Sequence, residues 1–130
     1  MKNIGLIAIG GGLGALARWA LIALIPGYLF PTNIFVINLS GSFFLGLVMS
    51  LAVEYSLLKE RGRLFWAVGV LGGFTTFSTF MMGTYSLLTG GAIPTAFTYL
   101  AASIILGLGA VGVGFAVPRL VFRRLASRDG

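Results

Sequence analysis

The stretch "GGFTTFSTF", residues 72–80, decides how the rest of this chain is interpreted. Two glycines, four Ser/Thr residues and three phenylalanines fill its nine positions, in the middle of an otherwise apolar run. Glycine has a low helix propensity, and Ser/Thr side chains compete with the helix for backbone hydrogen bonds. The stretch therefore predicts a break in a helix.

The composition around this stretch is that of a membrane protein. Of the 130 residues, 58% are hydrophobic and only 9% are charged, which separates the chain from soluble globular proteins. The length predicts a single domain, 1–130. The chain has no cysteine and no histidine, so it lacks disulfides, thiolate metal ligands and the commonest catalytic base. We do not expect an enzyme.

Four apolar runs predict an all-α protein with four transmembrane helices. A helix needs about 20 apolar residues to cross the hydrocarbon core, and such runs cover approximately 4–25, 32–53, 65–88 and 95–117. The connections are short, so neighbouring spans are expected to be antiparallel. The third run contains the opening stretch, and its helix is therefore expected to be broken in mid-membrane.

The net charge of +6 raises the question of nucleic acid, but the basic residues cluster at segment ends. There they act as topology signals and as contacts to lipid headgroups, so we expect membrane lipid and not nucleic acid as a partner. Four spans place both termini and the charged loop 54–63 on one side, which the positive-inside rule makes cytoplasmic. That side carries eight basic residues, namely Lys2, Lys59, Arg61, Arg63, Arg119, Arg123, Arg124 and Arg128.

Small residues recur four apart on every span. The pairs are Gly10 and Gly14, Ser42 and Gly46, Gly69 and Gly73, and Ser103 and Gly107. In lipid such faces let helix backbones approach closely. We expect most of them to pack helices within one bundle, and their abundance also favours an oligomer.

Polar side chains inside the spans are the first candidates for a functional site. Asn38, in the second span, either bonds a neighbouring helix or lines an aqueous path. Arg18 either extends to the interface or attracts anions at a vestibule. Tyr99 and Ser103 share one face of the fourth span; the alternatives are an interface position for the tyrosine and a bond from the serine to its own helix.

The predicted break adds backbone groups to these candidates. Unpaired backbone in mid-membrane is tolerated only where protein buries it or where it coordinates something, and freed carbonyls bind cations in broken helices. Phe77 and Phe80 are three apart, so they are expected to share a face and either pack in the core or turn their positive ring edges toward an anion. No carboxylate lies within a span, so proton coupling is not expected.

Three motifs together resemble one known family. "GGGLGALARW" (10–19), "VINLSGSF" (36–43) and "GGFTTFSTF" (72–80) are similar, in order and spacing, to the signature stretches of the Fluc (CrcB) fluoride channel family. The resemblance covers the whole chain. It implies a passive fluoride-selective channel of the bacterial inner membrane that exports cytoplasmic fluoride and lowers its toxicity. It also implies an antiparallel, dual-topology dimer with two pores at the subunit interface.

The resemblance also implies roles for individual residues. It places Arg18 at the vestibule, and a structural Na⁺ at the dimer centre on the backbone carbonyls of Gly72 and Thr75. The fluoride pore would be lined by Asn38, Phe77, Ser78, Thr79, Phe80, Tyr99 and Ser103. The chain departs from the family pattern at Ile34, often a threonine, and at Gly107, commonly a serine.

Two other functions remain as alternatives. A small dual-topology multidrug exporter has a similar length, but the absence of a carboxylate inside the spans argues against it. A membrane scaffold without transport activity would explain the small-residue faces but neither Asn38 nor the predicted break. The charge bias also leaves two partners open: a second copy of this chain, which is our first hypothesis, or a homologue of opposite orientation.

Overall fold

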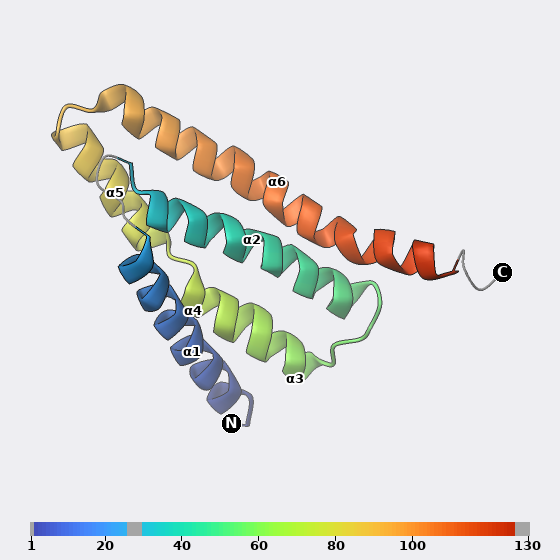
Figure 1. Cartoon of the computed structure of the whole chain (residues 1–130). Coiled ribbons are helices and arrows are strands. Elements are labelled where there is room, and N and C mark those ends of the chain that lie inside the picture. Colours follow the sequence, from blue (N-terminus) through green and yellow to red (C-terminus); the bar gives the residue numbers. More distant parts are fainter. Residues whose placement is uncertain (1, 26–29, 127–130) are drawn as a thin grey trace.

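The structure is a computed structural model that describes residues 2–25 and 30–126. Within these ranges the regular elements are all helical, which confirms the predicted class (Figure 1). In chain order they are α1 (Lys2–Leu24), α2 (Thr32–Val53), α3 (Glu60–Arg63), the π-helix η1 (Leu64–Leu71), α4 (Gly72–Phe74), α5 (Phe77–Thr89) and α6 (Ile93–Ala126).

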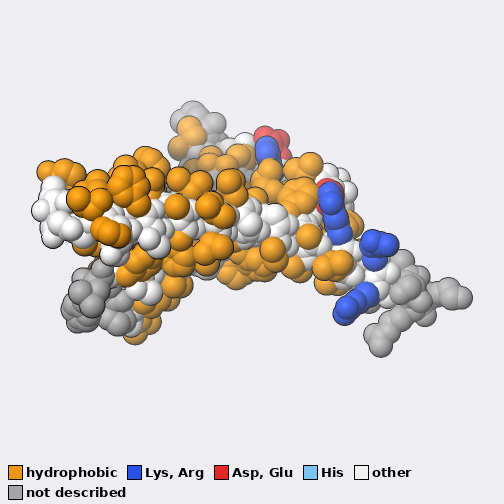
Figure 2. Space-filling model, turned by 90° about the horizontal axis from the view of Figure 1, so that it is seen from above, with side chains coloured by type: hydrophobic (Ala, Val, Ile, Leu, Met, Phe, Trp, Pro, Cys, Tyr) orange, Lys and Arg blue, Asp and Glu red, His pale blue; other side chains and the backbone are white. Residues whose placement is uncertain are grey.

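Four helical stretches are long and apolar enough to cross a membrane, as predicted. They cover Asn3–Leu24, Thr32–Val53, Glu60–Thr89 and Ile93–Arg124. Their large apolar side chains mostly face outward, and Figure 2 shows these along most of one face, with Lys and Arg gathered at one end. This distribution suits a chain that is surrounded by lipid.

Two boundaries differ from the sequence prediction. The fourth helix continues past 117, through Pro118, to Ala126; a proline removes one helical hydrogen bond without necessarily ending a helix. The charged loop predicted over 54–63 is partly helical, because Glu60–Arg63 forms α3. Arg128 and most of the first connection, 26–31, lie outside the described residues.

α1 packs closely against η1 and α4 (Figure 1). A Cβ added at Gly10 would lie 3.1 Å from the Gly69 Cα, and one at Gly14 would overlap the Val70 carbonyl. Gly73 in turn faces the backbone of Gly11. The predicted packing role of these small residues is confirmed, since only glycine lets the two backbones approach so closely.

α2 and α6 form the second close helix pair. Gly46 faces the Val111 carbonyl, and Gly114 on α6 faces the Phe43 carbonyl. Packing inside one chain therefore accounts for most of the small-residue pairs, and the case for an oligomer rests on other features.

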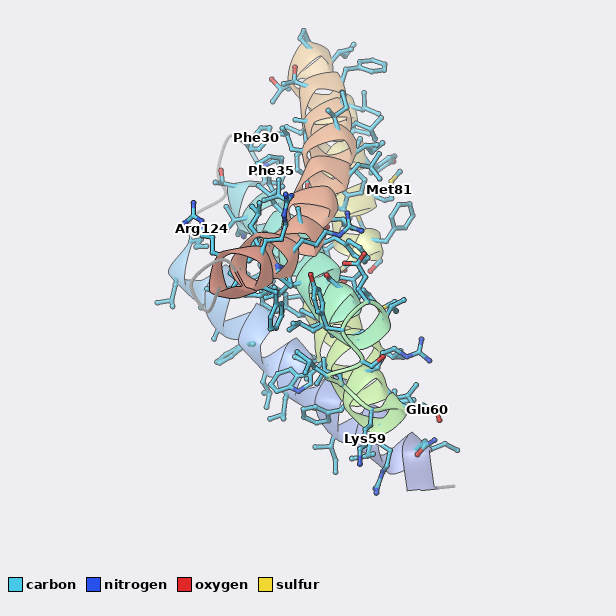
Figure 3. The ribbon with its side chains drawn as sticks, turned by 90° about the vertical axis from the view of Figure 1, so that its right-hand side faces the viewer. Phe30, Phe35, Lys59, Glu60, Met81 and Arg124 are labelled. Carbon is cyan, nitrogen blue, oxygen red and sulfur yellow. The ribbon has the colours of Figure 1, made fainter. Side chains whose placement is uncertain are left out.

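The buried core is small and lies where α2, α5 and α6 meet. It consists of Ile34, Ile37, Phe80 and Tyr99. Phe30 covers one side of it, with its ring edge-on to Tyr99 at 5.1 Å. Phe30 and Phe35 lie together in Figure 3, far from Lys59 and Glu60 at the other end of the molecule.

An ion pair joins α2 to α6 at the basic end. Arg119 Nε donates to both carboxylate oxygens of Glu54, at 2.9 and 3.0 Å, and Ser50 Oγ donates to Glu54 Oε2 at 3.1 Å. The hydrogen bond from Arg119 lowers the pKa of Glu54. Because both side chains are partly exposed, the pair adds little stability.

The close approach of α1 and η1 gives a first prediction. Gly14→Ala should destabilise the protein by about 1–3 kcal/mol, the usual penalty of overpacking, because the new methyl group meets the Val70 carbonyl. Gly12→Ala is the matched control on the same helix, since a Cβ there has nothing within 4 Å. Thermal unfolding in detergent measures both, and equal midpoints for the two variants would contradict this account of the helix pair.

Candidate functional site

The third apolar stretch is not helical at Thr75 and Thr76. α4 ends at Phe74, and the Thr75 N–H makes the last helical hydrogen bond, to the Leu71 carbonyl at 3.0 Å. Thr75 has φ −77° and ψ 156°, and Thr76 has φ −147° and ψ 119°, so both are extended. α5 then begins at Phe77. We call Thr75–Thr76 the interruption.

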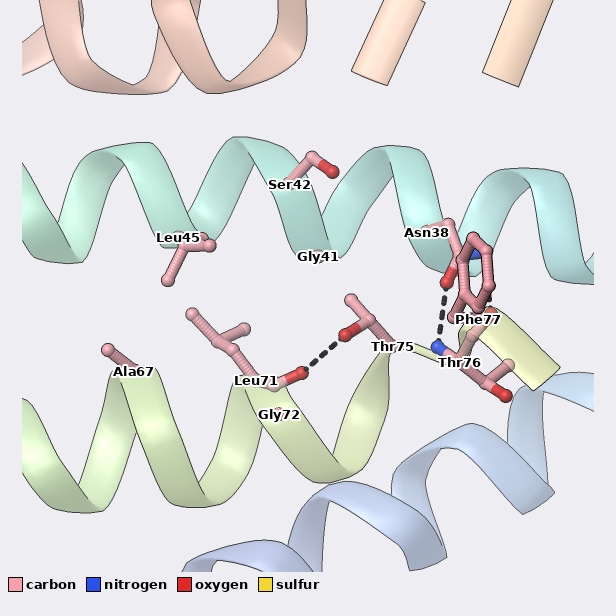
Figure 4. A pocket seen from close by; sticks show the side chains of 10 residues that line it. All are labelled: Asn38, Gly41, Ser42, Leu45, Ala67, Leu71, Gly72, Thr75, Thr76 and Phe77. Carbon is pink, nitrogen blue, oxygen red and sulfur yellow. Dashed lines mark hydrogen bonds between the residues drawn. The ribbon is translucent and has the colours of Figure 1, made fainter. Parts of the chain in front are cut away.

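Hydroxyl groups pair with the backbone on both sides of the interruption. Thr75 Oγ1 donates to the Leu71 carbonyl at 2.9 Å (Figure 4). Thr76 caps α5: its Oγ1 accepts from the Thr79 N–H at 3.3 Å and donates to Thr79 Oγ1 at 3.1 Å. Sequence reasoning did not single out Thr76 as a site residue, although a threonine ahead of a helical run is a typical N-cap.

Asn38 bonds the backbone of the interruption from α2. Its Nδ2 donates to the Thr76 carbonyl at 3.1 Å, and its Oδ1 accepts from the Thr76 N–H at 2.9 Å (Figure 4). Of the two alternatives left open by the sequence, the structure shows the interhelical hydrogen bond. One of the two Nδ2 hydrogens remains for another acceptor.

A pocket of about 280 Å³ lies between α2 and the interruption. Four of the predicted site residues line it together: Asn38, Gly72, Thr75 and Phe77 (Figure 4). Its polar groups are amides, hydroxyls and backbone, and no charged side chain lines it. Such a lining repels neither an anion nor a cation.

Phe77 and Phe80 are neighbours, but they do not share an environment. Their ring centroids lie 6.0 Å apart, yet Phe77 is 76% exposed and Phe80 only 6%. Phe80 packs on Tyr99 with centroids 5.1 Å apart. The two rings are thus neighbours, as their spacing predicts, but Phe80 belongs to the core while Phe77 stands at the edge of the pocket.

Two buried hydroxyls on α6 have no partner among the described residues, namely Tyr99 OH and Ser103 Oγ. Tyr99 is fully buried, so its ring does not face outward from this chain. The absence of a partner also rules out the bond from Ser103 to its own helix. Buried unpaired hydroxyls are rare in folded proteins, so this pair offers hydrogen bonds to something else.

The remaining predicted residues lie apart from this pocket. Thr79 lines a second pocket, of about 430 Å³, together with Asn33 and Ser86. Ser78 is exposed, and Arg18 is half-buried on α1. A single chain therefore brings four of the ten predicted site residues together at this pocket. These three residues lie outside it, and so do Phe80, Tyr99 and Ser103.

The interruption also frees a backbone carbonyl. In a continuous helix the Thr76 N–H would bond the Gly72 carbonyl, but here it donates to Asn38, so that carbonyl lacks its helical partner. Among the described residues no cluster of three or more acidic, histidine or cysteine side chains could hold a metal. Carbonyl oxygens suit a hard cation such as Na⁺. The carbonyl oxygen of Gly72, which lacks its helical partner, is therefore a suitable ligand for the predicted ion.

Comparison with known proteins gives one consistent result. Residues 5–115 match the CrcB-like protein family, described as Camphor Resistance (CrcB). The fluoride-specific ion channel FluC of Thermus thermophilus is 45% identical over 118 residues, which cover 88% of this chain and 94% of that protein. The protein of the same name from Agrobacterium fabrum is 37% identical over 127 residues, covering 94% of this chain and all of that protein.

Proposed function

The chain belongs to the CrcB family, and from this premise we propose that it is a fluoride-selective passive channel. It would let cytoplasmic fluoride leave across a bacterial inner membrane and so lower its toxicity. The helices and the relatives together make it a multi-pass membrane protein and not an enzyme. The structural observation that carries the proposal is that the buried hydroxyls of Tyr99 and Ser103 have no hydrogen-bond partner among the described residues. Of these two residues, Tyr99 packs on Phe80.

The chemistry of these groups suits fluoride. A channel must replace the hydration shell of its ion with groups that bind it weakly at several places. Tyr99, Ser103 and the second Nδ2 hydrogen of Asn38 provide neutral donors, and the ring edges of Phe77 and Phe80 add a weaker attraction. The hydroxyls of Ser78 and Thr79 are proposed to continue this path, and Arg18 to concentrate anions at a vestibule.

We also propose that the interruption lies in mid-membrane and helps to hold a structural Na⁺. The carbonyls of Gly72 and Thr75 are the proposed ligands, and the freed Gly72 carbonyl supports this assignment. One chain supplies few such oxygens, so a second subunit would have to complete the coordination. Gly72 is exposed on this chain, as such a shared ion requires.

A second, antiparallel subunit would also cover Phe77. Most exposed apolar side chains of this chain suit lipid, but Phe77, which is 76% exposed, stands beside a polar pocket, and we propose that the second subunit covers it. An antiparallel copy would bring two identical interruptions together at one depth in the membrane. The second subunit is proposed to be another copy of this chain, with a homologue of opposite orientation as the alternative, and residues 1–130 are taken as one domain.

The two rival functions fit less well. A proton-coupled multidrug exporter needs a carboxylate inside a span, whereas Glu54 follows the end of α2 and is paired with Arg119. A scaffold without transport activity gives no reason for two unpartnered buried hydroxyls. One flux experiment separates the fluoride channel from both rivals.

That experiment uses purified protein in liposomes loaded with potassium fluoride or potassium chloride, with valinomycin to carry the potassium. We expect rapid fluoride release at a fluoride electrode and no chloride release above that of empty liposomes. A protein that releases neither anion, or both equally, would overturn the assignment as a fluoride-selective channel.

The two aromatic rings give a further prediction. Phe77→Ile and Phe80→Ile should each lower fluoride flux at least about tenfold, the effect of raising the barrier by about 1.4 kcal/mol. Isoleucine stays apolar but has no positive ring edge. Phe97→Ile is the control, because Phe97 is 65% exposed on α6 and lines neither of the two pockets described. Normal flux in both folded pore variants would show that these rings have only a packing role.

Orientation can be tested because the chain has no cysteine. Ala92→Cys places a single thiol in the connection between α5 and α6, on the side opposite the basic residues. In intact cells, an impermeant thiol reagent should label about half the chains if insertion is dual. Labelling of nearly all chains, with flux retained and no homologue present, would exclude the antiparallel homodimer.

A further inference from the structure

Both main-chain polar groups of Thr76 are bonded by one side chain. Asn38 accepts from the Thr76 N–H at 2.9 Å and donates to the Thr76 carbonyl at 3.1 Å. A neighbouring β-strand would pair with an extended residue in the same way. Thr76 is only 7% exposed, so water does not replace these bonds.

Without this side chain the backbone has one nearby alternative. An unpaired N–H in an apolar environment costs several kcal/mol. The nearest helical acceptor for the Thr76 N–H is the Gly72 carbonyl. A hydrogen bond between these two groups would extend α4 by one residue. The Thr75 N–H already makes the equivalent bond to Leu71, so the helix ends at the residue that Asn38 holds.

The close approach of α2 lets a short side chain reach the interruption. Gly41 lies one turn after Asn38, and a Cβ there would overlap the Thr75 methyl group and lie 3.2 Å from the Phe74 ring. Glutamine would be one methylene too long at position 38. Aspartate would accept from the N–H but would turn an oxygen toward the Thr76 carbonyl.

We propose that Asn38 is a positioning residue whose amide replaces the missing main-chain partner of Thr76. It thereby holds α4 and α5 apart, keeps the Gly72 carbonyl free and sets the place of Phe77 at the pocket. This role differs from direct contact with fluoride, because it acts through Thr76. Its effect on Na⁺ rests on the proposed function, whereas its effect on the backbone does not.

The sharpest test changes the backbone at Thr76 and leaves every side chain in place. Replacing Thr76 by its α-hydroxy acid changes the backbone amide to an ester, which lacks the N–H that Asn38 accepts. The Na⁺ concentration for half-maximal fluoride flux should rise about tenfold, as expected for the loss of one strong hydrogen bond. The ester also weakens the Thr75 carbonyl as a ligand, so the control is the same ester in Asn38→Ala. There the Thr76 N–H has no Asn38 oxygen to lose, and the ester should shift the Na⁺ dependence much less than it does in the wild-type protein.

A second measurement is independent of transport. Spin labels at Trp66→Cys and Tyr85→Cys lie on exposed positions of η1 and α5, on either side of the interruption. Diluting labelled with unlabelled protein isolates the distance within one chain. Asn38→Ala and the Thr76 ester should broaden or displace this distance distribution, because the angle between α4 and α5 is no longer fixed. Asn33→Ala is the control, since among the described residues the Asn33 side chain accepts only from the N–H of its neighbour Ile34.

The outcomes separate this proposal from the proposed function. An unchanged distance distribution in Asn38→Ala and in the Thr76 ester would overturn the positioning role, whatever the flux. If the wild-type flux depends on Na⁺, an unchanged Na⁺ dependence in the Thr76 ester would overturn it as well; if the wild-type flux does not, the proposed Na⁺ site fails and the distance measurement decides. If the wild-type protein conducts no fluoride, the channel assignment fails, and the distance measurement alone still decides the role of Asn38.

Discussion

Every backbone polar group inside a membrane has to find its partner within the protein, and the structure depends on how this constraint is met at Thr75–Thr76. The chain loses helical hydrogen bonds there and replaces them with three other sets of hydrogen bonds. Thr75 bonds back to Leu71, Thr76 caps α5, and Asn38 pairs with the backbone of Thr76. The groups left over, above all the Gly72 carbonyl, are what the interruption makes available for function.

The sequence predicted features that depend on local composition. Four apolar runs gave four helices, glycines spaced four apart gave close helix packing, and "GGFTTFSTF" marked the place where the helix stops. Each of these follows from a short window, because helix propensity and span length are local properties. The break could therefore be predicted at that place, but how its backbone is bonded could not.

What the sequence could not give depends on contacts between distant segments. Asn38 and Thr76 are 38 residues apart, so no local pattern pairs them. Phe77 and Phe80 share a helical face by spacing, yet α6 covers only Phe80, by way of Tyr99. The packing of α1 against η1 likewise determines which glycines lie at a helix contact within the chain. Tertiary contact, and not periodicity, sets the environment of each site residue.

The two departures from the family pattern have different consequences in this structure. Ile34 is 4% exposed and packs in the core with Phe80 and Tyr99. An apolar side chain there therefore helps to hold the two aromatic rings in position. At Gly107 the missing side chain faces α2: the hydroxyl of Ser42 lies 3.8 Å from the position that a Cβ would take. Ser42 also lines the pocket beside Asn38. A hydroxyl from α2 thus stands close to where the family pattern puts one on α6, so the loss of a serine at 107 does not leave this region without a donor.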